Sequence, residues 1–121
     1  MHAELQTLLR TESTKTQSFQ EVMATIRRHY ECFPIAFTVG AGTDQPVNNP
    51  AGSNVASSQL LAFARRLGLS ETETLPLYRE HYRAVLEHPE GTDHANIRAF
   101  MAAGWAGVQF EGDPLRLRGP G

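Results

Sequence analysis

The sequence has few of the features that would commit it to disulfides, a membrane or a nucleic acid. Its single cysteine, Cys32, cannot form a disulfide within the chain. No apolar run approaches the roughly 20 residues that a membrane-spanning helix needs, and the N-terminus lacks the pattern of a secretory signal peptide. A net charge of -2 gives no sign of the basic face that nucleic-acid binding requires. We therefore expect no nucleic-acid partner and no association with a membrane.

What the sequence does contain is the composition of an ordinary globular domain. The hydrophobic fraction of 40% is sufficient for a core, and a length of 121 residues is usual for one domain. Leu5, Leu8 and Leu9 have helical spacing, and the stretch after them is rich in Ser, Thr and Gln. We accordingly divide the chain into a short N-terminal helix with a polar loop, residues 1–18, and a globular domain, residues 19–118.

Capping signals predict where two helices begin. Ser18 with Glu21, and Ser70 with Glu73, have the Ser-x-x-Glu spacing in which the two side chains cap each other's backbone N–H groups. Apolar residues recur at steps of three and four after Ser18, which predicts an amphipathic helix. Pro34 ends that helix, because the residue before a proline avoids helical geometry.

Glycine and proline predict the remaining helix boundaries. Gly68 and Gly104 each follow an apolar helical segment, where glycine is favoured because it readily adopts the left-handed conformation. Pro76 leaves a helix over either 71–87 or 75–87, because proline is tolerated in a first turn. The third helix is predicted to begin at Ser53 or Asn54, and the last at Thr92 or Asp93 with Ile97, Phe100 and Met101 on its buried side.

Little β-structure is predicted. Residues 35–39 are rich in β-forming side chains, and the alternation at residues 108–110 and 115–118 predicts a small C-terminal hairpin. Residues 40–54 carry turn signals throughout, and a loop of this length in a small domain is either mobile or functional. The sequence therefore predicts a mainly α fold, a compact single domain of four to five helices with one short strand and the hairpin.

Polar residues in three segments are candidates for a ligand site. They are Asn48 and Asn54 in the loop, Tyr82 and Arg83 before the Pro89 stop, and His94, Asn96 and Arg98 in the last helix. Arginine with asparagines can hold a carboxylate or a phosphate, and an imidazole at a helix start can serve as a base or an acceptor. The same side chains can instead fix backbone turns, with His94 holding the turn at 89–93. A cleft that joins the last helix to Asn48 or Asn54 would favour a small-ligand-binding protein or an enzyme, and a filled interior with these side chains tied to backbone would favour a non-enzymatic binding protein.

The sequence predicts neither a metal nor a cofactor. His81 and His88 are seven residues apart, which is about 10 Å along a helix and too far for both to bind one ion. The sequence contains no phosphate-binding loop, nucleophile elbow or acidic metal motif. A non-enzymatic protein is therefore favoured, although enzymatic activity is left open.

Motifs spread along the chain carry a resemblance to a known family. They are Tyr30-x-x-Phe33-Pro34-x-x-Phe37-Thr38, Asn48 with Asn54, Phe63-Ala64, Gly68-Leu69-Ser70, Thr74-Leu75, Tyr82-Arg83-x-Val85-Leu86, Pro89-x-Gly91, Asp93-His94-x-Asn96-Ile97-Arg98-x-Phe100-Met101 and Gly104-Trp105. With these motifs the chain resembles the HopJ type III effector family from residue 19 to about residue 115. The chain departs from the family pattern at Val39, at Ser57-Ser58-Gln59 and near Leu77-Tyr78.

The resemblance implies a HopJ-like bacterial protein that resides in the cytoplasm and is exported by a type III system. It implies a non-enzymatic binding protein with a host or bacterial protein as its partner. The alternative is a small-ligand-binding protein or an enzyme with its site around His94, Asn96 and Arg98.

Overall fold

The computed structural model describes residues 18–118, and the helix expected around Leu5 to Leu9 lies outside this range. The helices are α3 (Phe19–His29), α4 (Val55–Arg66), α5 (Glu71–Thr74), α6 (Glu80–Glu87) and α7 (Ala95–Ala103), with 3-10 helices η1 (Leu75–Tyr78) and η2 (Gly104–Gly107). The strands are β1 (Tyr30–Cys32), β2 (Phe37–Val39), β3 (Val47–Asn49), β4 (Gln109–Phe110) and β5 (Leu115–Leu117). None of the helices within 18–118 has the length and apolarity needed to cross a membrane.

The prediction of a mainly α domain is wrong, because the described part of the chain combines its helices with two antiparallel sheets. One sheet has the strand order β3-β2-β4, and the other consists of β1 and β5. The expected C-terminal hairpin is also wrong. β4 pairs with β2, whereas β5 pairs with β1, so the two strands of the predicted hairpin lie in different sheets. Both pairings join segments far apart in the sequence, and the fold is therefore a single domain of the α+β type.

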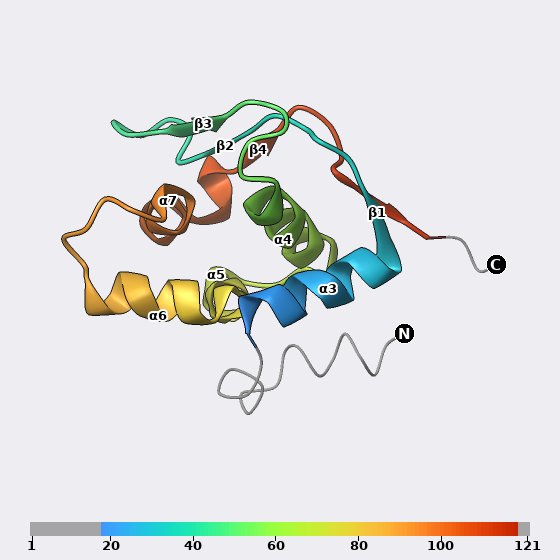
Figure 1. Ribbon diagram of the computed structural model, residues 1–121. Helices are drawn as coiled ribbons and strands as arrows, with labels where there is room; N and C mark the ends of the chain where they lie inside the picture. The colour runs from blue at the N-terminus through green and yellow to red at the C-terminus, as the bar shows by residue number, and fades with distance from the viewer. Residues whose placement is uncertain (1–17, 119–121) are drawn as a thin grey trace.

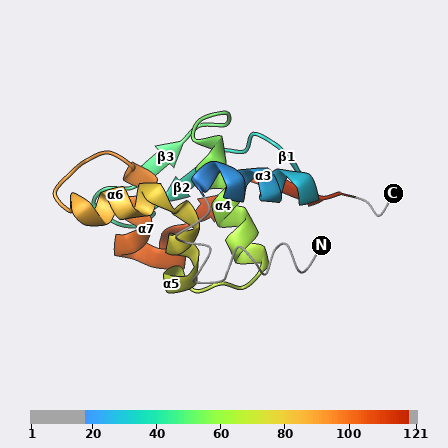
Figure 2. The same cartoon turned by 60° about the horizontal axis from the view of Figure 1, so that its bottom comes forward.

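The elements are arranged in layers (Figure 1). The β3-β2-β4 sheet lies along one side, α4 and α7 lie next to it, and α6 and α3 follow one another in a row along the opposite side. The turned view in Figure 2 shows the same row of α6 and α3 from its outer face. The core lies around α4, where Leu60, Leu61, Phe63 and Ala64 are fully buried. Because α7 contacts both β2 and β3, its first turn lies beside the end of the sheet.

Both predicted capping boxes are confirmed. The Ser18 hydroxyl accepts from the Glu21 N–H, and the Ser70 hydroxyl accepts from the Glu73 N–H, while each glutamate bonds back to its serine. The first of these helices ends earlier than expected, at His29, because Tyr30 turns extended and begins β1. Capping chemistry is local, so it could be predicted from the sequence.

The helix expected up to residue 87 is broken. Arg79 has φ 54° and ψ -121°, which separates η1 from α6 and gives each segment its own axis. A bulky residue rarely adopts this backbone conformation, and surrounding structure must hold it there. Arg79 is buried, and its Nη1 donates to the Pro76 carbonyl at 2.8 Å. The break sets the position of the α6 start, which is also where His81 lies.

The last helix differs from its prediction at the start and agrees at the end. Its N-cap is His94, with a left-handed φ of 51°, and not Thr92 or Asp93. Gly104 ends it with φ 66°, as predicted. Ile97 and Phe100 are buried, but Met101 is 43% exposed and does not belong to the core. Trp105 is half-buried, and its indole N–H donates to the Leu69 carbonyl at 2.8 Å.

Candidate functional site

A cleft of about 300 Å³ opens where α3, α4, α6 and α7 begin. Its apolar lining comes from Phe19, Val47, Ala56, Ala95 and Ile97, and its polar lining from Asn54, Ser57, Tyr78, His81, His94 and Asn96. The volume is at the lower end of the range found for small-molecule sites. Three of the residues predicted from the sequence, Asn54, His94 and Asn96, are therefore brought together.

The helix starts at the cleft differ in how they are capped. Ser18 caps α3, whereas the N-caps of α4, α6 and α7 make no side-chain capping bond. The first N–H groups of a helix have no partner within the helix and carry partial positive charge. At the beginning of α4 and of α7, the residues that carry these groups line the cleft, among them Ser57 and Ala95. The cleft therefore contains backbone N–H groups, in the first turns of α4 and α7, that no N-cap side chain binds.

Aromatic rings form one wall of the cleft. Phe19 stacks on Tyr78 at 5.9 Å and meets the edge of His81 at 4.7 Å, and His81 lies 5.0 Å from His94, all measured between ring centroids. Tyr78 is fully buried, and its hydroxyl donates to the Ser57 hydroxyl at 3.2 Å. Burial raises the pKa of this phenol, so it stays protonated and acts as a donor. The two imidazoles are thus the polar rings that remain accessible from the cleft.

Two amide side chains of the cleft lining, Asn54 and Asn96, are held by a third, Asn49, which lies outside the lining. Asn49 and Asn96 exchange two hydrogen bonds of 3.0 Å, and the Asn54 amide donates to the Asn49 oxygen at 2.7 Å. The Asn49 amide also donates to the carbonyls of Phe37 and Val47. Asn49 is 3% exposed and Asn96 is 6% exposed, so the pair is shielded from water. It links the sheet to the first turn of α7 and fixes Asn54 at the rim.

Asn48, the loop residue predicted for the site, does not take part in this cluster. It lies opposite Thr38 in the β2–β3 pairing, and the Thr38 hydroxyl donates to its side-chain oxygen at 2.9 Å. Successive residues of a strand point to opposite faces. Asn49 therefore points toward α7, where it meets Asn96. A second cavity of about 330 Å³ is lined by both Asn48 and Asn49.

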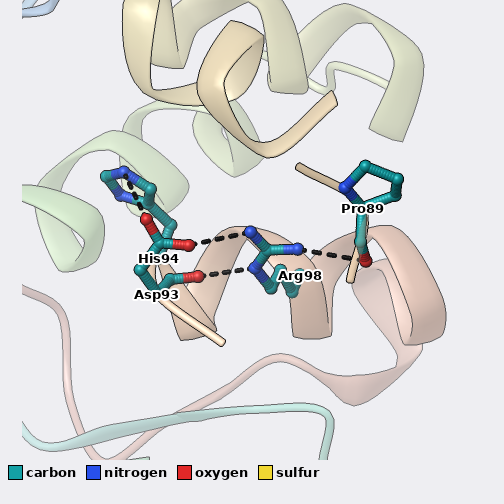
Figure 3. Close-up of polar contacts among 4 residues, drawn as sticks. All are labelled: Pro89, Asp93, His94 and Arg98. Atoms are coloured by element: carbon teal, nitrogen blue, oxygen red, sulfur yellow. Dashed lines mark hydrogen bonds and ion pairs between the residues drawn. The ribbon is translucent and has the colours of Figure 1, made fainter. Parts of the chain in front are cut away.

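Arg98 holds the turn before α7 and does not line the cleft. Its guanidinium donates to the Asp93 carbonyl at 2.6 Å, to the Asp93 carboxylate at 2.8 Å and to the Pro89 carbonyl at 3.3 Å (Figure 3). The bond from Arg98 lowers the pKa of the Asp93 carboxyl. The structural role that the sequence suggested for His94 thus belongs to Arg98. His94 Nε2 lies 3.8 Å from the Asp93 carboxylate, which is beyond hydrogen-bonding distance.

Tyr82 and Arg83 lie on α6 outside the cleft lining. Tyr82 is half-buried and packs against the core, and Arg83 is exposed. Sequence reasoning missed Asn49, Ser57, Tyr78 and His81 as residues of the site. The Asn-Asn pair at 48–49 was a usable signal, but choosing between the two requires the strand register. His81 approaches His94 only because of the break at Arg79.

The described residues contain no group of three His, Cys, Asp or Glu side chains placed to hold a metal ion. His81 and His94 are the two potential ligands that lie closest to each other within the cleft. The lining therefore offers hydrogen-bond donors and acceptors, aromatic faces and partial positive charge. These are groups that bind a ligand.

Comparison with known proteins assigns the chain to a family. The model of the family described as HopJ type III effector protein matches residues 3–115. The chain belongs to the HopJ type III effector family. The crystal structure titled as unknown function protein VPA0580 is similar to this HopJ protein, with 34% sequence identity and a TM-score of 0.85. The similarity covers 98% of this chain and 93% of that chain. The comparison with curated proteins produced no match.

Proposed function

We propose that this HopJ-family protein is a non-enzymatic binding protein and that the cleft at the helix starts is its binding site. One observation carries the proposal. The cleft joins His94 and Asn96 of α7 to Asn54 of the preceding loop, although these residues are 40 or more positions apart in the sequence. A filled interior would have favoured purely structural roles. Of the residues named from the sequence, Arg98 and Asn48 do have such roles.

The arrangement supports binding more than catalysis. A general base needs a partner that orients it, and the carboxylate nearest to His94 Nε2 lies 3.8 Å away. The Ser57 hydroxyl accepts a bond from Tyr78, and none of the hydrogen bonds among the described residues joins it to an imidazole. An activated nucleophile would need such a bond. The lining supplies polar and aromatic groups for contact with a ligand, and Asn49 holds two of them, Asn54 and Asn96, in place.

A pair of matched variants tests the proposal. Ala95 lines the cleft and is exposed, so Ala95→Trp should fill the cleft at little cost in stability. Ala102 lies on the same helix, is also exposed and is remote from the lining, which makes Ala102→Trp the control. A fragment library is screened against each protein by saturation-transfer NMR. Fragments that bind the wild type and Ala102→Trp but not Ala95→Trp support the proposal. A set of hits that Ala95→Trp leaves unchanged, or no hits at all, contradicts it.

Export is a separate part of the proposed function. The family description motivates it, and we propose that the protein leaves the bacterial cytoplasm through a type III system to reach a host partner. A fusion to a translocation reporter tests this directly. The signal should appear in host cells with a functional secretion system and disappear when the export ATPase is inactivated. Equal signals in the two strains would contradict export.

A further inference from the structure

The charge of the cleft indicates which ligands it favours. Among residues 18–118, its lining contains no carboxylate and no Lys or Arg side chain, and the accessible ionisable groups are His81 and His94. Within residues 18–118, neither imidazole takes part in a hydrogen bond through its ring nitrogens. An imidazole can donate to an anion whether it is neutral or charged. Both rings line the cleft, where an imidazole N–H can serve a ligand.

Three helix starts add positive potential from the backbone. The uncapped beginnings of α4, α6 and α7 meet at this cavity, and each has eight or more residues behind it. Their partial charges act together because the cavity encloses the ligand between them. The starts come from separate segments, so the convergence is a property of the tertiary fold. A negative group in the cleft would find N–H donors near both Ser57 and Ala95.

Two carboxylates lie close to the cleft and affect where a negative charge can bind in it. Glu80 accepts from the Phe19 N–H at 2.7 Å, and Asp93 is paired with Arg98. These bonds lower the pKa of both carboxyl groups, so each stays ionised. Neither carboxylate belongs to the lining, although that of Asp93 lies 3.8 Å from His94 Nε2. Their negative charges disfavour an anion at the edges of the cleft next to them.

We propose that the cleft binds a small molecule through a single anionic group, a carboxylate or a phosphate, with its apolar part against Phe19, Val47 and Ile97. This inference rests on the proposed function and specifies the ligand class of the same site. The imidazoles of His81 and His94 donate to the anion. The first-turn N–H groups of α4 and α7 donate to the same group.

Matched probes test the inference. Benzoate and phenyl phosphate carry the two candidate anions, and benzamide has the ring of benzoate without its charge. Each is titrated into the protein at constant ionic strength, with chloride as the background anion, and amide shifts are followed by NMR. We expect at least one of the anions to bind with a Kd about tenfold below that of benzamide. The shifts should centre on Ser57, His81 and Ala95. The anion that binds more tightly identifies whether the cleft favours a carboxylate or a phosphate.

Variants separate the imidazoles from the general charge of the protein. His94→Asn removes the ring and retains a residue that tolerates the left-handed conformation, and His81→Phe retains a ring without its nitrogens. Each should weaken anion binding by about fivefold and leave benzamide unchanged. His88→Asn is the control, because His88 is exposed and lies outside the lining. An equal loss in the His88→Asn control would mean that the effect is not local and would overturn the inference.

The two proposals can fail separately. If benzamide binds in the cleft as tightly as benzoate and phenyl phosphate, the anionic class is wrong and the binding site is retained. If cleft fragments exist but none carries a negative charge, the same conclusion follows. If neither the probes nor the fragment library affects the cleft, both proposals are refuted.

Discussion

Replacing Asn49 tests whether the buried amide cluster holds the cleft together. Asn49→Ala removes the bonds to Asn96 and Asn54 and those to the carbonyls of Phe37 and Val47. It leaves the Asn96 amide, which is 6% exposed, without its partner. An unsatisfied buried polar group costs about 1–3 kcal/mol. Because both the oxygen and the nitrogen of Asn96 are affected, we expect a loss of about 3 kcal/mol in the free energy of unfolding.

The reverse substitution should cost less. In Asn96→Ala the Asn49 oxygen keeps its bond from Asn54 at 2.7 Å, and the Asn49 nitrogen keeps both backbone carbonyls. We therefore expect a loss of only about 1–1.5 kcal/mol. The double variant should be less destabilised than the sum of the two, because it removes both members of one interacting pair.

Urea denaturation followed by the fluorescence of Trp105 measures these differences. Asn48→Ala is the matched control, since Asn48 is the exposed neighbour on the same strand and should cost no more than about 0.5 kcal/mol. The slope of unfolding against urea must stay constant for the comparison to hold. Equal losses for Asn49→Ala and Asn48→Ala, or strictly additive losses in the double variant, would refute the reasoning.

Three further predictions concern the end of α7 and the loss of folding stability at acid pH. Trp105→Phe keeps the aromatic contact and loses the bond to the Leu69 carbonyl, so the free energy of unfolding should fall by about 1 kcal/mol; because the variant has no tryptophan, its urea denaturation is followed by circular dichroism. Gly104→Ala should lower the melting temperature, because φ is 66° and the added Cβ would meet the Glu71 carboxylate; an unchanged value would contradict this. The backbone N–H of Trp105 donates to the Glu71 carboxylate and lowers its pKa below 4.5 in the folded state. The stability that this bond contributes is present above that pH and is lost as the pH falls through the folded pKa. Glu71→Gln should flatten the fall in the urea midpoint between pH 5 and 3, and an identical profile would exclude this role.

Local signals in the sequence predicted some of the helix ends. The capping boxes at Ser18 and Ser70 and the stops at Gly68 and Gly104 depend on residues within one or two turns, so one window of sequence contains their cause. The family could also be named, because its motifs are local. Such signals set the boundaries of elements and leave their arrangement open.

The sheets could not be predicted, because their strands have two or three residues and two of the three strand pairings join segments far apart in the sequence. Tyr30 pairs with Leu117, and Phe37 pairs with Phe110, and neither partner marks the other in the sequence. The two segments that looked like a hairpin, β4 and β5, find separate partners earlier in the chain. Their alternation was a correct sign of strands and carried no information about pairing.

The residues that line the cleft could be named in part for the same reason. His94 and Asn96 were identified from the start of a helix and Asn54 from a turn signal, and the fold brings these three residues together. Asn49 was not named, because which residue of a strand faces inward depends on the register. His81 was dismissed because its distance from His88 was measured along one helix, whereas its neighbour in the fold is His94.

Mapping the bound ligand tests the central claim, that the cleft at the helix starts is the binding site, most directly. The tightest fragment is added to uniformly ¹⁵N-labelled protein, and the amide shifts are assigned residue by residue. The account predicts the largest shifts at Ser57, His81 and Ala95 around the cleft. Shifts confined to Thr38, Asn48 and Gln109, which line the second cavity, would contradict it.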